Sequence, residues 1–424
     1  MAAHPDHLDD LRREAANGTP DALYAFAKQL IADGEPAQAH APLRAAAQAG
    51  HAGAQVELGR ARLYGVDADL DVPQAVEWLQ RAERAGHPGA SYLLALIALG
   101  GIALDRDLEA TGHRLLAAAK AGLVPAVRAL AMHFGRDRTN VAAMRQSEAL
   151  LAQGAAQHDG VCAALLAERI RHGELVGDAR YALDALDRLA RSAGIHSMPS
   201  LDGTPVVAGT DNRLQLDLES SLRAPTFVAC SHAPRIAIVD GLLSAEDCRY
   251  IIAMGSPHLI RSRVADPDSE GWIQHPARTS DDTAFGPVLE DFYLRLLQLR
   301  MAAAIGMEFT CAEPMVMLHY GPGQEYFPHR DYLPPETLAA NQPEAGQRAI
   351  TLLCYLSEVE AGGQTIFPKP NHIVTPRAGR AVAFWNLDDE GRPDADSLHA
   401  GLPVQRGEKW LATLWLRERR HRSF

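Results

Sequence analysis

The sequence predicts a multidomain α + β protein, in which an α-helical repeat solenoid precedes an antiparallel β domain of the closed or double-sheet type. Three observations support this fold class. The first half, roughly 200 residues, is rich in Ala and Leu and has apolar residues at helical spacing. Glycines recur there 36 residues apart, at Gly50, Gly86 and Gly122. After Pro234 the chain changes to short β-branched and aromatic runs separated by Gly and Pro.

Size and composition describe a globular chain long enough for more than one domain. Its 424 residues are 47% hydrophobic and 22% charged, so each half can bury a core. The formal net charge of −12 argues against nucleic acid or an anionic membrane as the main partner. The basic end of the chain, Arg417 to Arg422, is expected to be a solvated tail.

Cysteine usage and the absence of targeting signals favour a cytoplasmic location. The five cysteines are scattered and lack CxxC spacing, which favours a reducing compartment and neither a disulfide framework nor a zinc site. The start of the chain, MAAHPDHLDD, has no basic region and no apolar core, so we expect no signal peptide. The longest apolar stretch, Tyr92 to Leu104, is too short to span a bilayer as a helix.

A pattern of small residues organises residues 1–197. Each of three Ala-Gly pairs is followed by a further alanine four residues after its glycine, as in Ala49-Gly50 with Ala54. A period in the mid-thirties is typical of stacked helix pairs, in which glycine ends one helix and small residues allow close packing. Weaker copies occur at Gly18, near Gly154 and at Ala193-Gly194.

Two of these repeats, AAAQAGHAGAQVELGRARLYG and AVEWLQRAERAGHPGASYLLALIALG, resemble the SEL-type helical repeats, a branch of the tetratricopeptide superfamily. The resemblance covers roughly residues 10–195 and becomes degenerate after Gly122. It implies a concave surface that recruits a protein partner. The alternative is a structural extension or a dimerisation element.

A change of composition separates the two halves. The stretch SMPSLDGTPVVAGTDNR is rich in Gly, Pro, Ser and Asp and indicates a linker. We therefore expect helical repeats over residues 1–197, a linker over 198–233 and a β domain over 234–424.

Alternating or continuous β-branched and aromatic runs predict the strands of the second domain. These runs are RIAIVDG, PMVMLHYG, RAITLLCYLS, GGQTIFP, GRAVAFWN and KWLATLWL. Two helices are expected between them, Ser244–Met254 and Phe285–Ile305. Ser244 followed by two acidic residues is typical of a helix N-terminus.

Four residues near the C-terminus suggest a reaction type. His329 and Asp331 lie two residues apart, a spacing that places both side chains on one face of a strand. His399 follows later, and Lys409 comes ten residues after it. Two imidazoles and one carboxylate are the ligand set of non-haem Fe(II) oxygenases, which keeps positions open for substrates. Two other HxD pairs near the N-terminus have nothing downstream to complete them, and we interpret them as chance.

The sequence around these residues resembles the prolyl 4-hydroxylase family of 2-oxoglutarate/Fe(II) dioxygenases. The motifs that carry this resemblance are ARTSDDTAF, HYGPGQEYFPHRDY, RAITLLCYLSEVEAGGQTIFP, PRAGRAVAFWN and SLHAGLPVQRGEKWLATLWL. They lie in continuous order over about residues 234–420. The resemblance implies a double-stranded β-helix (jelly roll) with flanking helices.

The resemblance also assigns roles to single residues. His329, Asp331 and His399 match the iron ligands, and Lys409 matches the cation that pairs with the far carboxylate of 2-oxoglutarate. The other co-substrate positions are Thr413, Tyr355 and Tyr320, and the positions matching the substrate pocket are Tyr326, Trp415 and Arg348. The implied cofactors are Fe(II), 2-oxoglutarate, dioxygen and ascorbate. A carboxylate at position 331 implies hydroxylation, because related halogenases lack this ligand.

Three functions remain open at this point. The leading hypothesis is a hydroxylase of a proline in a peptide or protein, which the helical repeats recruit or position. The second keeps the chemistry but acts on a free amino acid or a small metabolite. The third is a repeat-based adaptor or oxygen sensor whose oxygenase domain is slow or silent. The long loop over residues 332–347 is expected to act as a lid.

Overall fold

The computed structural model describes residues 5–177, 180–192, 201, 216–265 and 272–424. The chain divides into two compact units. The first unit comprises residues 1–127, 199–207 and 423–424, and the second comprises residues 128–198 and 208–422. The expected domain boundary at 197 and nearly half of the expected linker lie outside the described residues, so those limits stay predictions.

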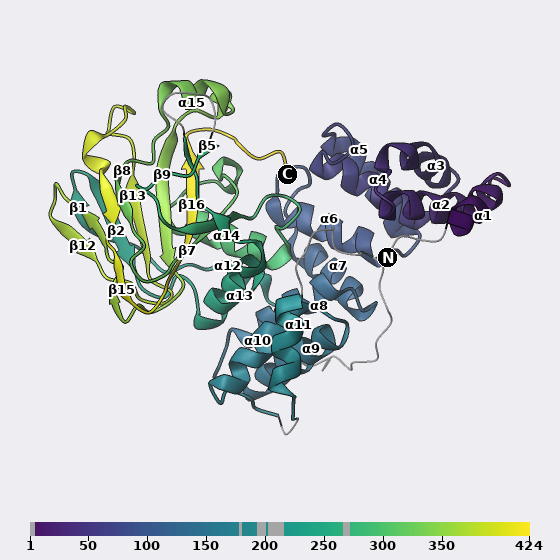
Figure 1. Cartoon of the computed structure of the whole chain (residues 1–424), viewed down its shortest axis with the longest axis horizontal. Helices are drawn as coiled ribbons and strands as arrows, with labels where there is room; N and C mark the ends of the chain where they lie inside the picture. Colours follow the sequence, from purple (N-terminus) through teal and green to yellow (C-terminus); the bar gives the residue numbers. More distant parts are fainter. Residues whose placement is uncertain (1–4, 178–179, 193–200, 202–215, 266–271) are drawn as a thin grey trace. The chain divides into compact units, whose positions relative to one another are not determined.

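Helix pairs build the first unit, as the repeats predict (Figure 1). Its helices are α1 (Pro5–Ala15), α2 (Pro20–Ala32), α3 (Pro36–Gln48), α4 (Ala52–Tyr64), α5 (Val72–Arg84), α6 (Pro88–Gly100) and α7 (Leu108–Lys120). Gly50, Gly86 and Gly122 follow the ends of α3, α5 and α7 with φ of 96°, 81° and 80°. Only glycine adopts this left-handed conformation without strain, which explains the period of the pattern.

Small residues bring paired helices close together in this unit. A Cβ on Gly59 of α4 would lie 2.9 Å from Cγ of Leu79 on α5, so a larger residue would push the pair apart. Alanines and leucines of α2, α3 and α4 form the buried cluster beside them. Among the described residues no single helix is long and apolar enough to cross a membrane, and one bent pair, Leu108–Lys120 with Val124–Gly135, passes on length and composition alone.

Later helices of the repeat region belong to the second unit. They are α8 (Val124–Gly135), whose first residues lie in the first unit, α9 (Val141–Ala156), α10 (Gly160–Arg171) and α11 (Leu183–Ser192). A short helix of the expected linker, α12 (Leu218–Leu222), belongs to the second unit as well. The repeat near Gly154 is irregular, because this glycine lies inside α9 and packs on Cys162. The copy at Ala193-Gly194 lies outside the described residues.

Buried ion pairs join these helices to the β domain within the second unit. Arg128 contacts Asp159 of the helical region at 2.6 Å and Asp291 of the β domain at 3.0 Å. Arg169 of α10 donates through Nε to Glu246 at 2.9 Å, and both side chains are almost fully buried. Removal of one partner would leave a buried charge unpaired, so α8–α10 and the β domain stabilise each other.

Two antiparallel sheets face each other across the β domain, which confirms the expected double-stranded β-helix. The larger sheet has the order β1-β2-β13-β9-β16-β7-β6-β3, and the smaller has the order β12-β11-β14-β8. The larger sheet contains β1 (Val228–His232), β2 (Arg235–Val239), β3 (Ile260–Arg261), β6 (Asp281–Ala284), β7 (Val316–Tyr320), β9 (Arg348–Tyr355), β13 (Ala381–Trp385) and β16 (Lys409–Arg417). The smaller contains β8 (Tyr326–His329), β11 (Thr365–Phe367), β12 (His372–Val374) and β14 (His399–Gly401).

Two short ladders complete the strand content, β4 (Val264–Ala265) with β5 (Trp272–Ile273) and β10 (Ala361–Gly362) with β15 (Val404–Arg406). The core lies between the two large sheets. Tyr355 and Phe384 of the larger sheet pack there with Phe367 and Val374 of the smaller. β1 lies in the expected linker, so the larger sheet begins before residue 234.

Two helices flank the larger sheet (Figure 1). α13 (Ala245–Gly255) begins at the expected Ser244, which forms a reciprocal capping box with Asp247. α14 (Phe292–Ala304) is shorter than the expected helix from Phe285 to Ile305. Its start moves because the Asp291 side chain accepts a hydrogen bond from the backbone N–H of Leu294 and caps the helix there.

The segment over residues 332–347 contains α15 (Pro335–Ala340) and a short 3-10 turn (Pro343–Ala345). Both of its ends are held, because the Gln347 side chain bonds the backbone of Leu333 through Oε1 at 2.5 Å and Nε2 at 2.8 Å. Arg417 donates to the carbonyl oxygens of Asn341 and Gln342. Its role as a lid stays a prediction.

The expectation of a solvated basic tail is wrong for two of its arginines. Arg417 is fully buried and pairs with Glu313 at 3.2 Å. Arg422 pairs with Glu290 at 2.7 Å and lies over the ring of Phe309. Acidic partners distant in the sequence neutralise these charges inside the second unit, and the composition of the tail alone does not reveal them.

Candidate metal centre

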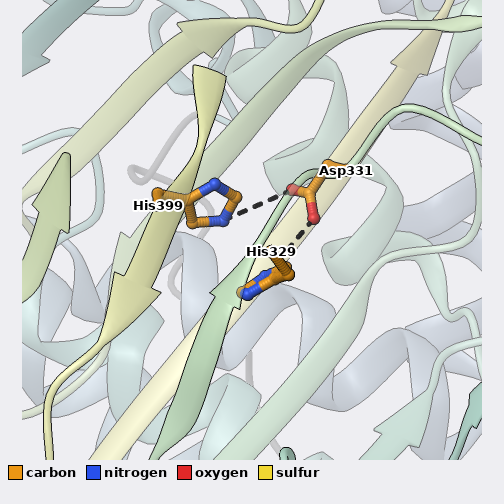
Figure 2. A group of neighbouring side chains, drawn as sticks. All are labelled: His329, Asp331 and His399. Carbon is orange, nitrogen blue, oxygen red and sulfur yellow. Dashed lines mark ion pairs between the residues drawn. The ribbon is translucent and has the colours of Figure 1, made fainter. Parts of the chain in front are cut away.

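Three side chains converge at one end of the smaller sheet. Nε2 of His329 lies 3.6 Å from Oδ1 of Asp331, and Nε2 of His399 lies 4.0 Å from Oδ2 (Figure 2). One ligand atom from each residue lies within 4.8 Å of the other two. Among the described residues this is the group with metal-binding spacing.

Strand pairing explains why residues so far apart in sequence meet. β8 and β14 are antiparallel neighbours, and His329 lies directly opposite His399. Each ring is oriented by its own backbone, since Nδ1 of His329 lies 2.8 Å from the carbonyl of Phe327 and Nδ1 of His399 lies 3.1 Å from that of Ser397. These contacts place the proton on Nδ1 and leave Nε2 with a free lone pair.

The electrostatics suit a divalent cation. Burial and the neighbouring His399 lower the pKa of His329 to about 3, so its imidazole is neutral and able to donate a lone pair. Burial alone would raise the pKa of Asp331, but the two histidines and Arg348 hold it at about 2. Two imidazoles and one carboxylate fit the facial ligand set of Fe(II).

Hydrogen bonds from the larger sheet hold Asp331. The hydroxyl of Thr351 on β9 donates to Oδ2 at 2.8 Å. The indole N–H of Trp415 on β16 donates to the same oxygen at 3.1 Å. The side-chain amide of Asn386 donates to the Thr351 hydroxyl at 2.9 Å. The carboxylate is therefore oriented by side chains from outside its own segment.

Lys409 provides a positive charge at the base of the site. It is 2% exposed, and burial lowers its pKa to about 7. Its Nζ would lie 3.5 Å from a Cβ placed on Gly401, which is two residues beyond His399. Among the described residues, the ammonium of Lys409 has no hydrogen-bond or ion-pair partner, and its neighbours are aromatic rings. A buried ammonium without an acidic partner is a suitable anchor for the carboxylate of a ligand.

Two of the other three predicted co-substrate residues contact Lys409, and the third lies further along the same strand. The Nζ atom of Lys409 lies 5.2 Å from the ring centre of Tyr320, its partner across β7 and β16, and 5.8 Å from that of Tyr355. The hydroxyl of Tyr355 donates to Thr365 of the smaller sheet at 2.7 Å. Thr413 is buried on the same strand as Lys409, and its side chain points to the same face of the sheet. Burial raises the pKa of both tyrosines, so both are protonated.

The predicted substrate residues lie nearer the ligands. The Tyr326 ring stacks on His329 with centres 3.5 Å apart, and burial raises the pKa of Tyr326 to about 12. Trp415 contacts Asp331 as described above. The Arg348 guanidinium lies 3.9 Å from the Trp415 ring centre and donates twice to Glu313, at 2.9 and 2.7 Å. Trp415 therefore holds the side chain of Asp331, and Arg348 holds the ring of Trp415, in addition to any contact with a substrate.

Sequence reasoning missed Thr351, Asn386 and Thr365. Thr351 is the polar residue inside the apolar strand RAITLLCY, and it is fully buried. Asn386 directly ends the apolar strand AVAFW and is also fully buried. A polar residue within or at the end of a buried strand requires a hydrogen-bond partner, and this signal was available in the sequence.

Comparisons with known proteins agree with this geometry. Residues 315–417 match the model of the 2OG-Fe(II) oxygenase superfamily. The chain is 35% identical over 205 residues to "Probable prolyl 4-hydroxylase 3" of Arabidopsis thaliana, which covers 44% of this chain and 70% of that relative.

Solved structures with similarity include one for each half. The viral collagen prolyl hydroxylase of Paramecium Bursaria Chlorella virus-1 is 29% identical to this chain, with a TM-score of 0.34. The match covers 43% of this chain and 95% of the viral chain. A Sel1 repeat protein from Oxalobacter formigenes is 18% identical to this chain, with a TM-score of 0.37. That match covers 44% of this chain and 79% of the Sel1 repeat protein. The extent and identity of the match to the plant relative show that this chain belongs to the prolyl 4-hydroxylase family of 2-oxoglutarate- and Fe(II)-dependent oxygenases.

Proposed function

We propose that this chain hydroxylates a prolyl residue in a peptide or protein. In this reaction one oxygen atom of dioxygen enters a C–H bond of the substrate, which becomes C–OH. The other enters 2-oxoglutarate, which loses CO₂ and becomes succinate. Iron, when bound, supplies the activation of dioxygen.

The observation that carries this proposal is the presence, in one domain, of a three-residue candidate ligand cluster and a buried ammonium that has no acidic partner among the described residues. His329, Asp331 and His399 would hold the metal, and Lys409 would pair with the far carboxylate of 2-oxoglutarate. The Tyr355 ring centre lies 5.8 Å from that ammonium, and Thr413 is a further buried hydroxyl on the same strand face, so we propose both as co-substrate-binding groups. Tyr320 would contact the keto-acid end of the co-substrate.

A prolyl ring is an apolar target, and the residues nearest the ligands suit it. Tyr326 and Trp415 present aromatic surface, and Arg348 adds a cation stacked on Trp415. Phe327 of the same strand as Tyr326 is 47% exposed, so a peptide has apolar surface to contact beside His329. We propose that these residues position the substrate chain while the metal site oxidises it.

The direct experiment supplies the full chain with Fe(II), 2-oxoglutarate and proline-containing peptides. We expect succinate release that depends on the peptide, and a mass increase of one oxygen atom on proline. Peptides with Pro→Ala and the Asp331→Ala enzyme serve as matched controls. Oxidation of free amino acids or metabolites with no oxidation of any peptide would favour the small-molecule alternative, and no turnover of any compound would favour the adaptor.

We also propose that helices of the first unit recruit the substrate. The structure dictates the truncation that tests this role. Deletion of residues 1–200 would remove Arg128 and Arg169 and leave Asp291 and Glu246 without their buried partners. Deletion of residues 1–122 keeps both pairs. We expect it to raise KM for a protein substrate but not for a short peptide, and an unchanged KM for both would refute recruitment.

Two finer points belong to the same proposal. Ascorbate would sustain turnover as the reductant that restores the ferrous state, which predicts longer linear progress curves when it is added. A cytoplasmic location follows from the cysteine usage, and cell fractionation tests it.

A further inference from the structure

We infer that Thr351, Asn386 and Trp415 form a hydrogen-bonded support that makes Asp331 a one-oxygen metal ligand. The inference goes beyond the proposed function, because it concerns how the ligand set is held and applies to any substrate. It assigns positioning roles to three residues that the ligand set itself does not include.

The count of lone pairs on Asp331 is the first step. Each carboxylate oxygen offers two lone pairs. Oδ2 accepts one hydrogen bond from Thr351 at 2.8 Å and one from Trp415 at 3.1 Å, so both of its lone pairs are used. Oδ1 accepts no hydrogen bond from a described residue, and it lies 3.6 Å from Nε2 of His329. Oδ1 is therefore the atom free to bind a metal.

The direction of the Thr351 hydroxyl is the second step. A hydroxyl has a single proton and an ionised carboxylate can only accept, so the Thr351 proton points to Asp331, and a donor on the other side of the hydroxyl stabilises that direction. Asn386 is this neighbour, and its Nδ2 donates to Thr351 at 2.9 Å. Asn386 is fully buried, and its Oδ1 has no hydrogen-bond partner among the described residues. The amide keeps its nitrogen toward Thr351 even though its own oxygen is left unpaired.

The position of the Trp415 indole is the third step. Arg348 stacks on its ring at 3.9 Å, and two hydrogen bonds to Glu313 hold that guanidinium in place. Fully buried Arg417 donates to the same glutamate at 3.2 Å. The backbone of Trp415 pairs with Thr351 on β9, and its carbonyl accepts a hydrogen bond from the backbone N–H of Glu313 at 2.9 Å. The indole N–H is therefore directed at Asp331 by packing and charge.

Binding through one oxygen has a chemical consequence. The facial ligand set works only if the remaining metal positions stay open for co-substrate and dioxygen. A carboxylate that rotates and binds through both oxygens would occupy one of them. The support prevents this rotation, since Oδ2 would have to give up two hydrogen bonds.

The test uses the full chain loaded with Co(II), whose visible absorption reports coordination number, and no peptide. Thr351→Val removes the hydroxyl, Trp415→Phe removes the N–H, and Asn386→Asp presents an acceptor that draws the Thr351 proton away from Asp331. We expect each to weaken Co(II) binding roughly 10- to 100-fold and to change the spectrum. Thr351→Ser should restore both.

Controls separate positioning from folding. Thr283→Val removes a buried hydroxyl from β6 of the same sheet and should leave affinity and spectrum unchanged. Thermal unfolding checks that each variant is folded. If Thr351→Val does not fold, Asn386→Asp, which keeps the shape of the side chain, provides the test instead. Wild-type affinity and spectrum in folded Asn386→Asp and Trp415→Phe would overturn the inference. A failed peptide assay would bear only on the proposed substrate.

Discussion

The two sheets of the β domain contribute differently to the site. The smaller sheet supplies the imidazoles, His329 on β8 and His399 on β14, which face each other across one strand pair. The larger sheet supplies the groups that act around the metal, among them Lys409, Thr351 and Trp415. The smaller sheet thus carries two of the three candidate metal ligands, and the larger sheet carries the side chains that bond to Asp331 and the candidate co-substrate anchor.

This division explains why some residues of the site can be recognised in the sequence and others cannot. His329 and Asp331 lie two residues apart, so their pairing can be recognised from local spacing, whereas His399 reaches them only through strand pairing. A supporting residue needs only to lie on a neighbouring strand. Thr351 and Trp415 are paired across β9 and β16 but lie 64 positions apart in the chain.

Removal of an imidazole should have the largest effect. His399→Ala deletes a ligand, and loss of an outer hydrogen bond alone lowers metal affinity roughly 10- to 100-fold, so we expect a loss of more than about 100-fold and no succinate release. Calorimetry with Mn(II) measures the binding. His372→Ala, which changes a histidine of β12 in the same sheet, is the control. Retained metal binding in His399→Ala would break the assignment of this sheet.

The second prediction concerns pH and the larger sheet. Burial lowers the pKa of Lys409 to about 7, and only its ammonium form pairs with a carboxylate. Affinity for 2-oxoglutarate should therefore be constant below pH 7 and fall up to about tenfold per pH unit above it, with a proton taken up on binding. Calorimetry of the Mn(II)-loaded protein measures this profile.

Lys409→Arg provides the matched control for the pH profile. A guanidinium stays protonated over the whole range, so the variant should show a flat profile. If the wild-type profile is flat as well, the ammonium of Lys409 does not bind the co-substrate.

The smallest effect is expected where the two sheets touch. The Tyr355 hydroxyl on β9 donates to Thr365 on β11 at 2.7 Å, a bond between the larger and the smaller sheet. Tyr355→Phe keeps the packing and leaves Thr365 without this donor, so the free energy of unfolding should fall by about 1–2 kcal/mol. Urea unfolding measures the change. An unchanged stability together with weaker 2-oxoglutarate binding would show that the hydroxyl serves the co-substrate alone.

Much of this architecture is predictable from the sequence. The 36-residue period predicts the turns at Gly50, Gly86 and Gly122, and the structure confirms them through positive φ angles. The alternating runs predict the principal strands of the larger sheet, and the HxD pair, together with the family motifs around it, predicts His329 and Asp331 as candidate metal ligands. Each of these signals is local, because a turn, a strand or a two-residue ligand pair depends on neighbours in the chain.

The remaining features depend on long-range pairing. Arg128 of α8 and Arg169 of α10 join these helices to the β domain. Their acidic partners there lie 163 and 77 residues away in the sequence. In the sequence, Arg417 is the first residue of a basic run, yet in the structure it is fully buried against Glu313. Nothing in the local composition identifies such partners, since the pairing is set by how the helices and strands pack.

The most direct test of the division between the sheets is the binding behaviour of Lys409→Met. Methionine keeps the length of the side chain and removes the charge, so the larger sheet loses its anchor while the smaller sheet keeps its ligands. The account predicts wild-type Mn(II) affinity and 2-oxoglutarate binding weakened roughly 10- to 150-fold, equivalent to about 1.5–3 kcal/mol. Wild-type 2-oxoglutarate affinity, or loss of the metal together with the co-substrate, would contradict it.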